Sequence, residues 1–303
     1  MQGQALVELG QALAKERYSF VTVTPTSHAR VIARYAQSPG RTLRDIFGWS
    51  RAFANDALPV RWVELLKTAG ALREEAGGLL RSGVRFSTVG DRLYVHSAYP
   101  TLDADAVFFG PDTYRYISLL RAEVRGADRL VDVGCGSGAG GLELAPLCRQ
   151  LVLADISPRA LELAAVNCAL AGRPEVALVR SDVLAQVEGP LDCVISNPPY
   201  LSDDRGRVYR DGGGPLGFDL SVRITREALA RLSPGGTFVL YTGSPIIDGR
   251  DPLKAALEPV LEASAARHRY FELDPDVFGE ELERPAYREA DRIAVVAVVA
   301  VKR

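Results

Sequence analysis

The chain has 303 residues, of which 47% are hydrophobic and 24% charged, and its formal net charge is −2. This composition is typical of a globular protein with one large or two smaller domains, and the near-zero charge argues against a protein that coats nucleic acid. Because no apolar run reaches the ~18 residues that span a bilayer and the N-terminus has no basic-then-apolar leader pattern, we expect a cytoplasmic protein without membrane contact.

The four cysteines are Cys135, Cys148, Cys168 and Cys193, and they lie in apolar or glycine-rich contexts without a C-x-x-C pair. They are predicted to be free thiols, as in a reducing compartment. Since the three histidines are also scattered, the sequence contains no metal-ligand cluster, and we expect a protein without a metal.

Residues 1–105 are predicted to form a separate domain of helices followed by a β-hairpin. Apolar residues at helical spacing predict helices over Leu6–Leu13, Ser27–Tyr35 and Thr42–Phe47, and a further one that begins at Pro59. Alternating residues over Val84–Val89 and Arg92–His96, joined by Gly90-Asp91, predict the hairpin. This succession resembles a winged-helix module, which implies a domain for substrate recognition.

This N-terminal region carries 13 Lys/Arg and 10 Asp/Glu, a net charge of +3. Such a mild excess is typical of an ordinary solvated surface, and it is also compatible with contact to nucleic acid or to an acidic partner. The two tryptophans, Trp49 and Trp62, are expected in the hydrophobic core of the region rather than as platforms for base stacking.

A glycine-rich turn follows the first strand of the second part of the chain. The apolar strand Leu130–Val133 runs into Gly134-Cys135-Gly136-Ser137-Gly138, and helical spacing follows over Ala139–Leu147. Strand, glycine turn and helix in this order are typical of nucleotide sites in doubly wound α/β folds. The acid Asp132 before the turn repels phosphate and attracts a sulfonium or ammonium cation, so the pattern favours S-adenosylmethionine over a dinucleotide.

Two more acids follow the next two predicted strands. Asp155 ends the apolar strand that begins at Leu151, at about the position where a doubly wound fold places an acid on a ribose. The strand Val176–Val179 leads to Asp182 and Val183, where a carboxylate can accept a hydrogen bond from an adenine amine. Each acid alone is as typical of a helix cap or a solvated loop. Because the carboxyl ends of parallel strands face one crevice, the acids together predict one cofactor site.

The segment Asn197-Pro198-Pro199-Tyr200 follows the apolar strand Cys193–Ser196. Two prolines lock φ and remove two backbone donors, which leaves a stiff corner with bare carbonyls. The side-chain oxygen of Asn197 and one such carbonyl can accept both protons of a planar NH2 group, and the Tyr200 ring can stack on that group. The pattern predicts a clamp for an amide or an exocyclic base amine, although a double proline also ends many ordinary strands.

From about Val107 onward the sequence resembles the class I S-adenosylmethionine-dependent methyltransferases. Its Asn-Pro-Pro-Tyr branch is similar to the HemK-type enzymes, which methylate a glutamine amide in peptide-chain release factors. The same motif occurs in methyltransferases that act on amino groups of adenine or guanine. Pro111-Asp112-Thr113 and the glycine-rich stretch Asp211–Gly217 also resemble the HemK type, with Gly110 and Tyr114 in place of the usual arginine and glutamate.

The resemblance implies an α/β domain over residues 106–303, with a Rossmann-like, doubly wound sheet of seven strands and helices on both faces. The expected strands are Leu130–Val133, Leu151–Asp155, Val176–Val179, Cys193–Ser196, Thr237–Tyr241, about Tyr270–Leu273 and Ile293–Val301. The last of them would be the antiparallel insertion usual in this fold.

The resemblance also implies direct transfer of a methyl group from S-adenosylmethionine to nitrogen, with S-adenosylhomocysteine as product. Asn197, Pro198, Pro199 and Tyr200 would form the catalytic corner, with Asn197 and the Pro198 carbonyl accepting the N–H protons and Tyr200 stacked on the amide plane. The residues expected to bind the cofactor are Asp132, Gly134, Cys135, Gly136, Gly138, Asp155, Ile156, Asp182, Val183 and Asn197. The loop Ser202–Gly214, rich in glycine and charge, is a candidate lid.

Three functions remain compatible with the sequence. The first is methylation of a protein glutamine amide, for which a release factor is the expected partner. The second is methylation of an exocyclic amine in RNA or DNA, or of a small-molecule amine. The third is a winged-helix regulator with an inactive methyltransferase fold. Asp211–Gly217 favours the first, the winged-helix-like region favours the second, and the intact corner with its three acids argues against the third.

Overall fold

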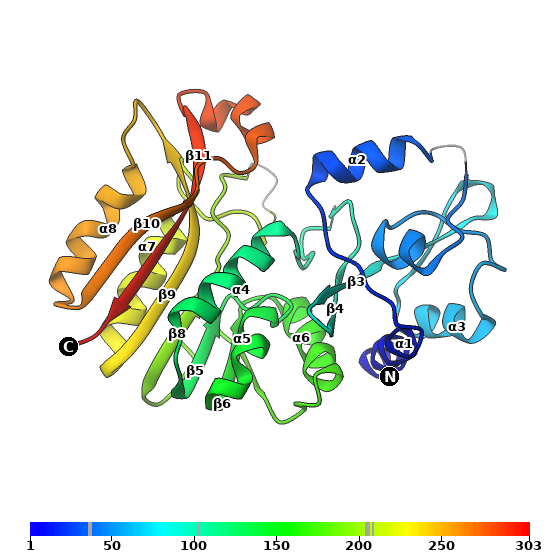
Figure 1. The fold of residues 1–303 in the computed structure, drawn as a ribbon, viewed down its shortest axis with the longest axis horizontal. Coiled ribbons are helices and arrows are strands. Elements are labelled where there is room, and N and C mark those ends of the chain that lie inside the picture. The colour runs from blue at the N-terminus through cyan, green and yellow to red at the C-terminus, as the bar shows by residue number, and fades with distance from the viewer. Residues whose placement is uncertain (36–37, 102, 204–206, 208) are drawn as a thin grey trace.

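The computed structural model describes residues 1–35, 38–101, 103–203, 207 and 209–303, and Figure 1 shows it as a ribbon. The helices are α1 (Gln2–Lys15), α2 (Pro25–Ala33), α3 (Val60–Thr68), α4 (Pro111–Glu123), α5 (Ala139–Leu144), α6 (Pro158–Leu170), α7 (Asp219–Arg231) and α8 (Pro252–Ala263). Short helical turns are η1 (Arg44–Gly48), η2 (Ala76–Gly78), η3 (Ala145–Leu147), η4 (Gly279–Glu283) and η5 (Pro285–Tyr287). The strands are β1 (Leu72–Glu74), β2 (Leu80–Ser82), β3 (Val84–Val89), β4 (Arg92–Ser97), β5 (Ala127–Val133), β6 (Cys148–Asp155), β7 (Ala177–Arg180), β8 (Leu191–Ser196), β9 (Leu232–Ile246), β10 (Arg267–Asp274) and β11 (Arg292–Val301).

The large sheet has seven strands in the order β10-β11-β9-β8-β5-β6-β7. Strands β5 to β9 pair in parallel, whereas β11 lies antiparallel between β9 and β10. This arrangement confirms the predicted doubly wound sheet and its antiparallel last strand. Parallel strands covered on both faces are apolar at successive positions, which explains the uninterrupted apolar runs in the sequence.

Helices cover both faces of this sheet, with α4, α5 and α6 on one side and α7 and α8 on the other (Figure 1). Successive strand residues point to opposite faces. Leu130 and Ile195 therefore join the core beneath the first group of helices, and Val131 and Val194 join the core beneath the second. The strands end in the crevice where the first and second halves of the sheet diverge, which is where ligands bind in open α/β sheets.

The start of β9 differs from the predicted strand Thr237–Tyr241, because β9 begins at Leu232 and includes Pro234-Gly235-Gly236, a sequence typical of a turn that breaks a strand. The register explains the difference: Leu191 pairs with Leu232, and Cys193 pairs with Thr237. The extra residues bulge out of the ladder with β8, and they bond instead to Lys302 at the end of the chain. The predicted break is therefore a bulge within one strand.

The N-terminal part contains the predicted helices and the β3–β4 hairpin, and it packs directly on the sheet domain. Leu9 and Leu13 of α1 share one hydrophobic core with Leu163 and Val166 of α6. Trp49 and Trp62 are half-buried against this core, as expected. The division of the chain at residues 105 and 106 stays a prediction.

Asn167 of α6 joins the two parts at a buried position. Its Oδ1 accepts a hydrogen bond from the backbone N–H of Val95 at 2.7 Å, and its Nδ2 donates to the carbonyl of Val95 at 2.9 Å. The same Nδ2 donates to the carbonyl of Ser137 in the glycine-rich turn at 2.9 Å. One side chain thus links the hairpin, helix α6 and that turn.

All four cysteines are free thiols, and Cys148 is half-buried while the other three are buried. Within the described ranges, no group of three or more His, Cys, Asp or Glu side chains is placed to hold a metal ion. Among the helices described, none is long and apolar enough to cross a bilayer.

Candidate active site

A cavity of about 460 Å³ lies at the carboxyl ends of the parallel strands. Twelve of the residues predicted for the site lie in its wall: Asp132, Gly134, Cys135, Gly136, Asp155, Ile156, Asp182, Val183, Asn197, Pro198, Pro199 and Tyr200. Gly138 does not, because it caps α5 with φ of +77° and faces the side chain of Leu153. The topology therefore brings together segments far apart in the chain, as in the bond between Asp112 and Tyr200, which lie 88 residues apart.

The glycine-rich turn leaves open space above its backbone. Gly134 has φ of +67°, and a Cβ built there would meet no atom within 4 Å. The backbone N–H groups of Gly134 and Cys135 donate to the Ala154 carbonyl at 2.8 and 3.1 Å, which fixes the turn against β6. A ligand can approach the bare backbone closely here, as S-adenosylmethionine would require.

Asp132 is a buried acid at the end of β5. Its Oδ2 accepts a hydrogen bond from the N–H of Gly141 at 2.8 Å, and its Oδ1 accepts one from the Tyr116 hydroxyl at 3.4 Å. Burial, assisted by the nearby Asp155, raises the pKa of this carboxyl to about 7, although the hydrogen bonds from the Gly141 N–H and the Tyr116 hydroxyl oppose the rise. A cation bound beside Asp132 would favour its charged form.

We expect Asp132→Asn to gain stability relative to the wild type as the pH rises. A carboxyl with a pKa near 3.8 when unfolded and about 7 when folded holds its proton longer in the folded chain. Stability is therefore lost between these pH values as the pH rises, by up to roughly 4 kcal/mol, and asparagine does not titrate. Urea unfolding at pH 5 and pH 8 measures the difference, and a difference that stays constant with pH would contradict the buried charge.

Asp155 links the ends of β5 and β6. Its Oδ2 accepts from the N–H of Gly136 at 2.9 Å, and its Oδ1 accepts from the N–H of Ser157 at 2.9 Å. Burial raises the pKa of Asp155, and these backbone N–H groups oppose the rise. The carboxylate keeps further lone pairs, so it can accept ligand hydroxyls while it shapes the turn.

Asp182 is engaged by a residue that the sequence reasoning did not identify. Arg223 of α7 donates to both carboxylate oxygens at 2.8 and 2.9 Å, and both side chains are about half-exposed. Asp182 and Arg223 lie 41 residues apart in the sequence, and no local sequence pattern predicts their contact. Asp182 lines the cavity, and its contact with an adenine amine stays a prediction.

The Asn-Pro-Pro-Tyr corner closes one side of the cavity. The side chain of Asn197 is half-buried in the wall, and no residue in the described part of the chain forms a hydrogen bond with it. Tyr200 is buried beneath the corner, and its hydroxyl donates to Oδ2 of Asp112 at 2.6 Å. Its ring lies against the backbone of Gly243, where a Cβ would come within 2.6 Å of the ring atom Cε2. The amide of Asn197 is thus free for a ligand, while Tyr200 is fixed by its surroundings.

Asp112 organises this side of the site, although the sequence analysis gave it no role. Besides Tyr200, it accepts from the Tyr241 hydroxyl at 2.8 Å and from Arg115 at 3.3 Å. Burial and the neighbouring Asp112 raise the pKa of Tyr200, so its hydroxyl keeps the proton that it donates. In the sequence, the Pro-Asp-Thr element pointed to Asp112. The sequence around Tyr241 of β9 contains no pattern that predicts its contact with Asp112.

The glycine-rich stretch supports the corner from behind. The N–H of Leu201 donates to the Arg210 carbonyl at 3.2 Å, and the N–H of Gly212 donates back to the Leu201 carbonyl at 2.9 Å. A Cβ on Gly212 would lie 2.6 Å from the carbonyl oxygen of Pro199. A Cβ on Gly217, which has φ of +80°, would collide with the backbone between Leu201 and Ser202. These positions require glycine because two backbones touch.

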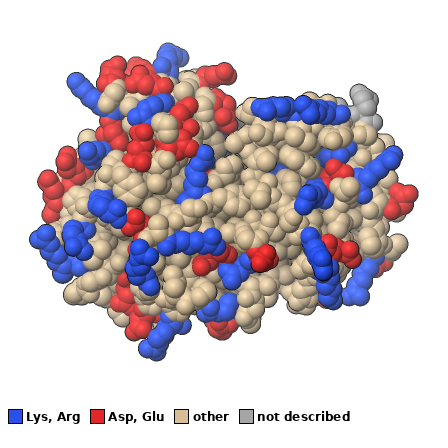
Figure 2. Space-filling view, in the orientation of Figure 1, with Lys and Arg blue, Asp and Glu red and all other residues tan. Residues whose placement is uncertain are grey.

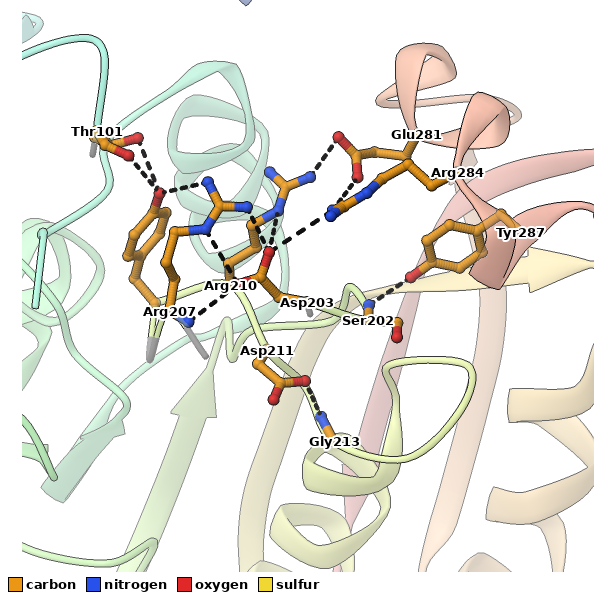
Figure 3. Close-up of polar contacts among 11 residues, drawn as sticks. Thr101, Ser202, Asp203, Arg207, Arg210, Asp211, Gly213, Glu281, Arg284 and Tyr287 are labelled. Atoms are coloured by element: carbon orange, nitrogen blue, oxygen red, sulfur yellow. Dashed lines mark hydrogen bonds and ion pairs between the residues drawn. The ribbon is translucent and has the colours of Figure 1, made fainter. Parts of the chain in front are cut away.

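An ion-pair network anchors the described part of the following loop (Figure 3). The Asp203 side chain is fully buried, accepts from the backbone N–H of Arg207 at 3.0 Å and pairs with Arg210 and Arg284. The hydrogen bonds from Arg207 hold the pKa of Asp203 well below its usual range. Glu281 of η4 pairs with Arg284 at 3.1 Å and with Arg210. Residues 204–206 and 208 of the candidate lid lie outside the described residues, so the lid stays a prediction.

Comparison with known proteins agrees with this geometry. The family model described as "Methyltransferase small domain" matches residues 115–260. The release factor glutamine methyltransferase of Deinococcus radiodurans is 35% identical over 196 residues, which cover 60% of this chain and 66% of that one. The enzyme of the same name from Borreliella burgdorferi is 30% identical over 135 residues, which cover 41% and 47%. The matches thus span about half to two thirds of these relatives' length.

Among solved structures, wild-type Trm5b from Pyrococcus abyssi superposes with a TM-score of 0.52 at 13% identity, covering 93% of this chain and 79% of that one. At that identity the likeness shows the fold alone. The sheet, the turn and the matched family define a class I methyltransferase domain. In sequence the chain is similar to release factor glutamine methyltransferases, which are enzymes of the HemK type.

Proposed function

We propose that this protein transfers a methyl group from S-adenosylmethionine to the side-chain amide nitrogen of a glutamine in a peptide-chain release factor. One observation carries the proposal: the side-chain amide of Asn197, which forms no hydrogen bond with the described residues, lines the same cavity as the glycine-rich turn and its acids. The names of the similar curated proteins support the choice of acceptor.

The chain's own residues fit the cofactor. Asp132 and the bare backbone of the turn would hold the cationic methionine end, Asp155 the ribose, and Asp182 with Val183 the adenine. Bound there, S-adenosylmethionine supplies an electrophilic methyl carbon and leaves as S-adenosylhomocysteine. The protein then has mainly to orient the acceptor.

The corner would do that orienting. The Asn197 side chain and the Pro198 carbonyl accept the two N–H protons of the acceptor amide, which directs its nitrogen toward the methyl group and favours the charge that develops there. Pro199 keeps the corner stiff. Tyr200, held by Asp112, presents one wall to the amide plane. The proton leaves after transfer, so no strong base is required.

The N-terminal region, residues 1–105, would select the acceptor, in the manner of a winged-helix-like module attached to the catalytic residues 106–303. The macromolecular partner is a protein in this proposal. We place the enzyme in the cytoplasm, where its free thiols stay reduced.

A nucleic-acid acceptor is the second candidate, which rests on the mild positive charge of the N-terminal region. On the face in Figure 2, Lys and Arg over that region form a short row along the upper edge and elsewhere lie beside acidic side chains, so they do not form one continuous patch. Phosphate backbones are bound mainly by clustered Lys and Arg, so this face favours the protein acceptor. A regulator with an inactive domain is a third candidate, and it would not bind S-adenosylmethionine.

Radiolabelled S-adenosylmethionine tests the proposal with purified release factor and with an undermethylated cell extract, and Asn197→Ala serves as the control. Label on the release factor that protease removes and nuclease leaves is the expected result. Label that only nuclease removes would assign the enzyme to base amines, and absence of cofactor binding would leave the regulator.

Asp155→Ala is expected to weaken S-adenosylmethionine binding about tenfold to a hundredfold. The change removes a ribose acceptor and also the two bonds that hold Gly136 and Ser157, and hydrogen bonds to charged groups contribute about 1.5–3 kcal/mol each. Titration calorimetry measures the affinity. Unchanged affinity would show that the ribose lies elsewhere.

A further inference from the structure

Arg85 of β3 is a buried cation without a counter-charge. Its side chain belongs to a residue that is only 3% exposed, and its Nε has no hydrogen-bond partner. Its Nη2 donates to Nδ1 of His28 at 3.1 Å. Its guanidinium carbon lies 5.5 Å from the ring centre of Phe20 and 5.7 Å from that of Tyr99. Within the described part of the chain, no Asp or Glu forms an ion pair with it.

The guanidinium borders a second cavity, of about 160 Å³. That volume is roughly ten times the ~10–15 Å³ that one water needs. The wall combines the N-terminal region, through His28, Arg85 and Tyr99, with the start of α4 and the segment around Phe278. Phe108, Asp112 and Phe278 border this cavity and the larger one as well, so the two lie on either side of a shared wall.

On the N-terminal side of the second cavity, Arg85 carries a positive charge that no Asp or Glu among the described residues pairs with, and Arg115, Asp112, Asp276 and Glu280 also line the wall. Burial lowers the pKa of Arg85 only to about 10, so the guanidinium remains charged at neutral pH. Burial and the nearby Arg85 lower the pKa of His28 to about 4, so that imidazole is neutral and accepts the bond from Arg85. A buried charge is costly unless it is paired and hydrogen-bonded, and within the described residues the guanidinium of Arg85 has no anionic partner and its buried Nε has no acceptor.

We propose that this cavity is a carboxylate-binding subsite in which Arg85 recognises a carboxylate of the methyl acceptor. A planar carboxylate carries one charge and matches the guanidinium fork, whose Nε and neighbouring N–H groups donate in one plane. Asp276 and Glu280 also line the cavity, and they disfavour a dianionic phosphate. The claim that the carboxylate belongs to the methyl acceptor rests on the proposed function. The claim that the cavity binds a carboxylate rests on the geometry of the cavity itself.

Acetate binding to the full chain tests the subsite without cofactor or acceptor. Sodium acetate, sodium phosphate and sodium chloride are compared at equal ionic strength, and the Nε–H resonance of Arg85 is followed by nitrogen-15 NMR. A saturable shift with acetate alone is expected. Arg85→Lys should weaken acetate binding about tenfold to a hundredfold, because an ammonium lacks the fork and charged hydrogen bonds contribute about 1.5–3 kcal/mol. A shift with phosphate alone, or none with acetate, would overturn the proposal.

Thermal unfolding separates a ligand-binding arginine from a structural one. In chloride, Arg85→Met should be at least as stable as the wild type because it removes an unpaired buried charge, and acetate should no longer raise its melting temperature. Arg61→Met is the matched control, since Arg61 lies on α3 with its side chain 77% exposed. A methionine variant that is less stable in chloride, with no acetate response in the wild type, would make Arg85 structural. If that variant does not fold, the lysine variant decides.

The link to the acceptor has its own readout. Arg85→Met should raise the KM for the release factor and leave kcat nearly unchanged, because the subsite binds a group remote from the reacting nitrogen. If acetate binds but no release factor is methylated by the wild type, the subsite stands and the proposed function fails. If Arg85→Met and the wild type have equal KM values for the release factor, the carboxylate that binds Arg85 does not belong to the acceptor.

Discussion

Asn197→Ala is expected to lower methyl transfer about 100- to 1000-fold while S-adenosylmethionine binds nearly as in the wild type. Removing one preorganised group that stabilises charge in the transition state typically has an effect of this size. The Asn197 amide forms no hydrogen bond within the described residues, so its loss breaks no internal contact that they supply. Single-turnover kinetics with labelled cofactor measure the rate, and titration calorimetry measures the affinity.

The same variant should unfold at nearly the wild-type urea concentration. This control matters because a misfolded protein would lose both rate and affinity. If affinity and rate fall by equal factors in a folded variant, Asn197 holds the cofactor and does not clamp the acceptor.

Gly217→Ala is expected to damage both stability and methyl transfer, although residue 217 is absent from the cavity wall. The positive φ of +80° costs an alanine about 1–2 kcal/mol. Its Cβ would also lie only 2.5 Å from the Ser202 nitrogen, well inside van der Waals contact, and such overpacking adds about 1–3 kcal/mol. The stretch can relieve the collision only by moving away from Leu201, which leaves the corner unsupported.

Gly235→Ala is the matched control for that prediction. Gly235 has φ of +79°, and a Cβ there would meet nothing within 4 Å. Gly235→Ala should lose only the stability that a positive φ costs an alanine, and its methyl transfer should stay at the wild-type level. Urea unfolding and labelled transfer assays compare the two variants, and equal losses would show that contact with the corner is not what requires glycine at position 217.

The sheet could be read from the sequence because its strands are buried on both faces. Continuous apolar runs such as those ending at Val133 and Ser196 do not occur in loops, and the glycine turn and double proline mark their ends. The bulge at the start of β9 could not be read in the same way. A Pro-Gly-Gly turn between strands and a bulge inside one strand have the same local pattern, and only pairing with β8 distinguishes them.

The residues of the site could be predicted where a single segment of the sequence carries a recognisable motif. Asp132 and Asp155 lie at the ends of their strands and Asn197 directly follows its strand, and parallel pairing of the strands brings them together. Partners from distant elements were not predictable. The hydroxyl of Tyr241 reaches its acid across 129 residues of chain, and a buried tyrosine on a strand resembles any other core residue. In the sequence, Arg85 likewise looks like any other arginine of a hairpin, and only the folded structure shows that it is buried.

The single amide of Asn167 limits how such an enzyme can be rebuilt. Exchange of domains between such enzymes assumes that the N-terminal region can be replaced as a unit while the catalytic domain keeps its structure. Here the hairpin of the N-terminal region and the glycine-rich turn share one buried side chain, and α1 packs against α6. A transplanted N-terminal region would have to restore that amide's three bonds and that packing, or the turn would lose its shape. Under the proposed role of this region in selecting the acceptor, single substitutions are therefore less disruptive to the fold than exchange of the whole region.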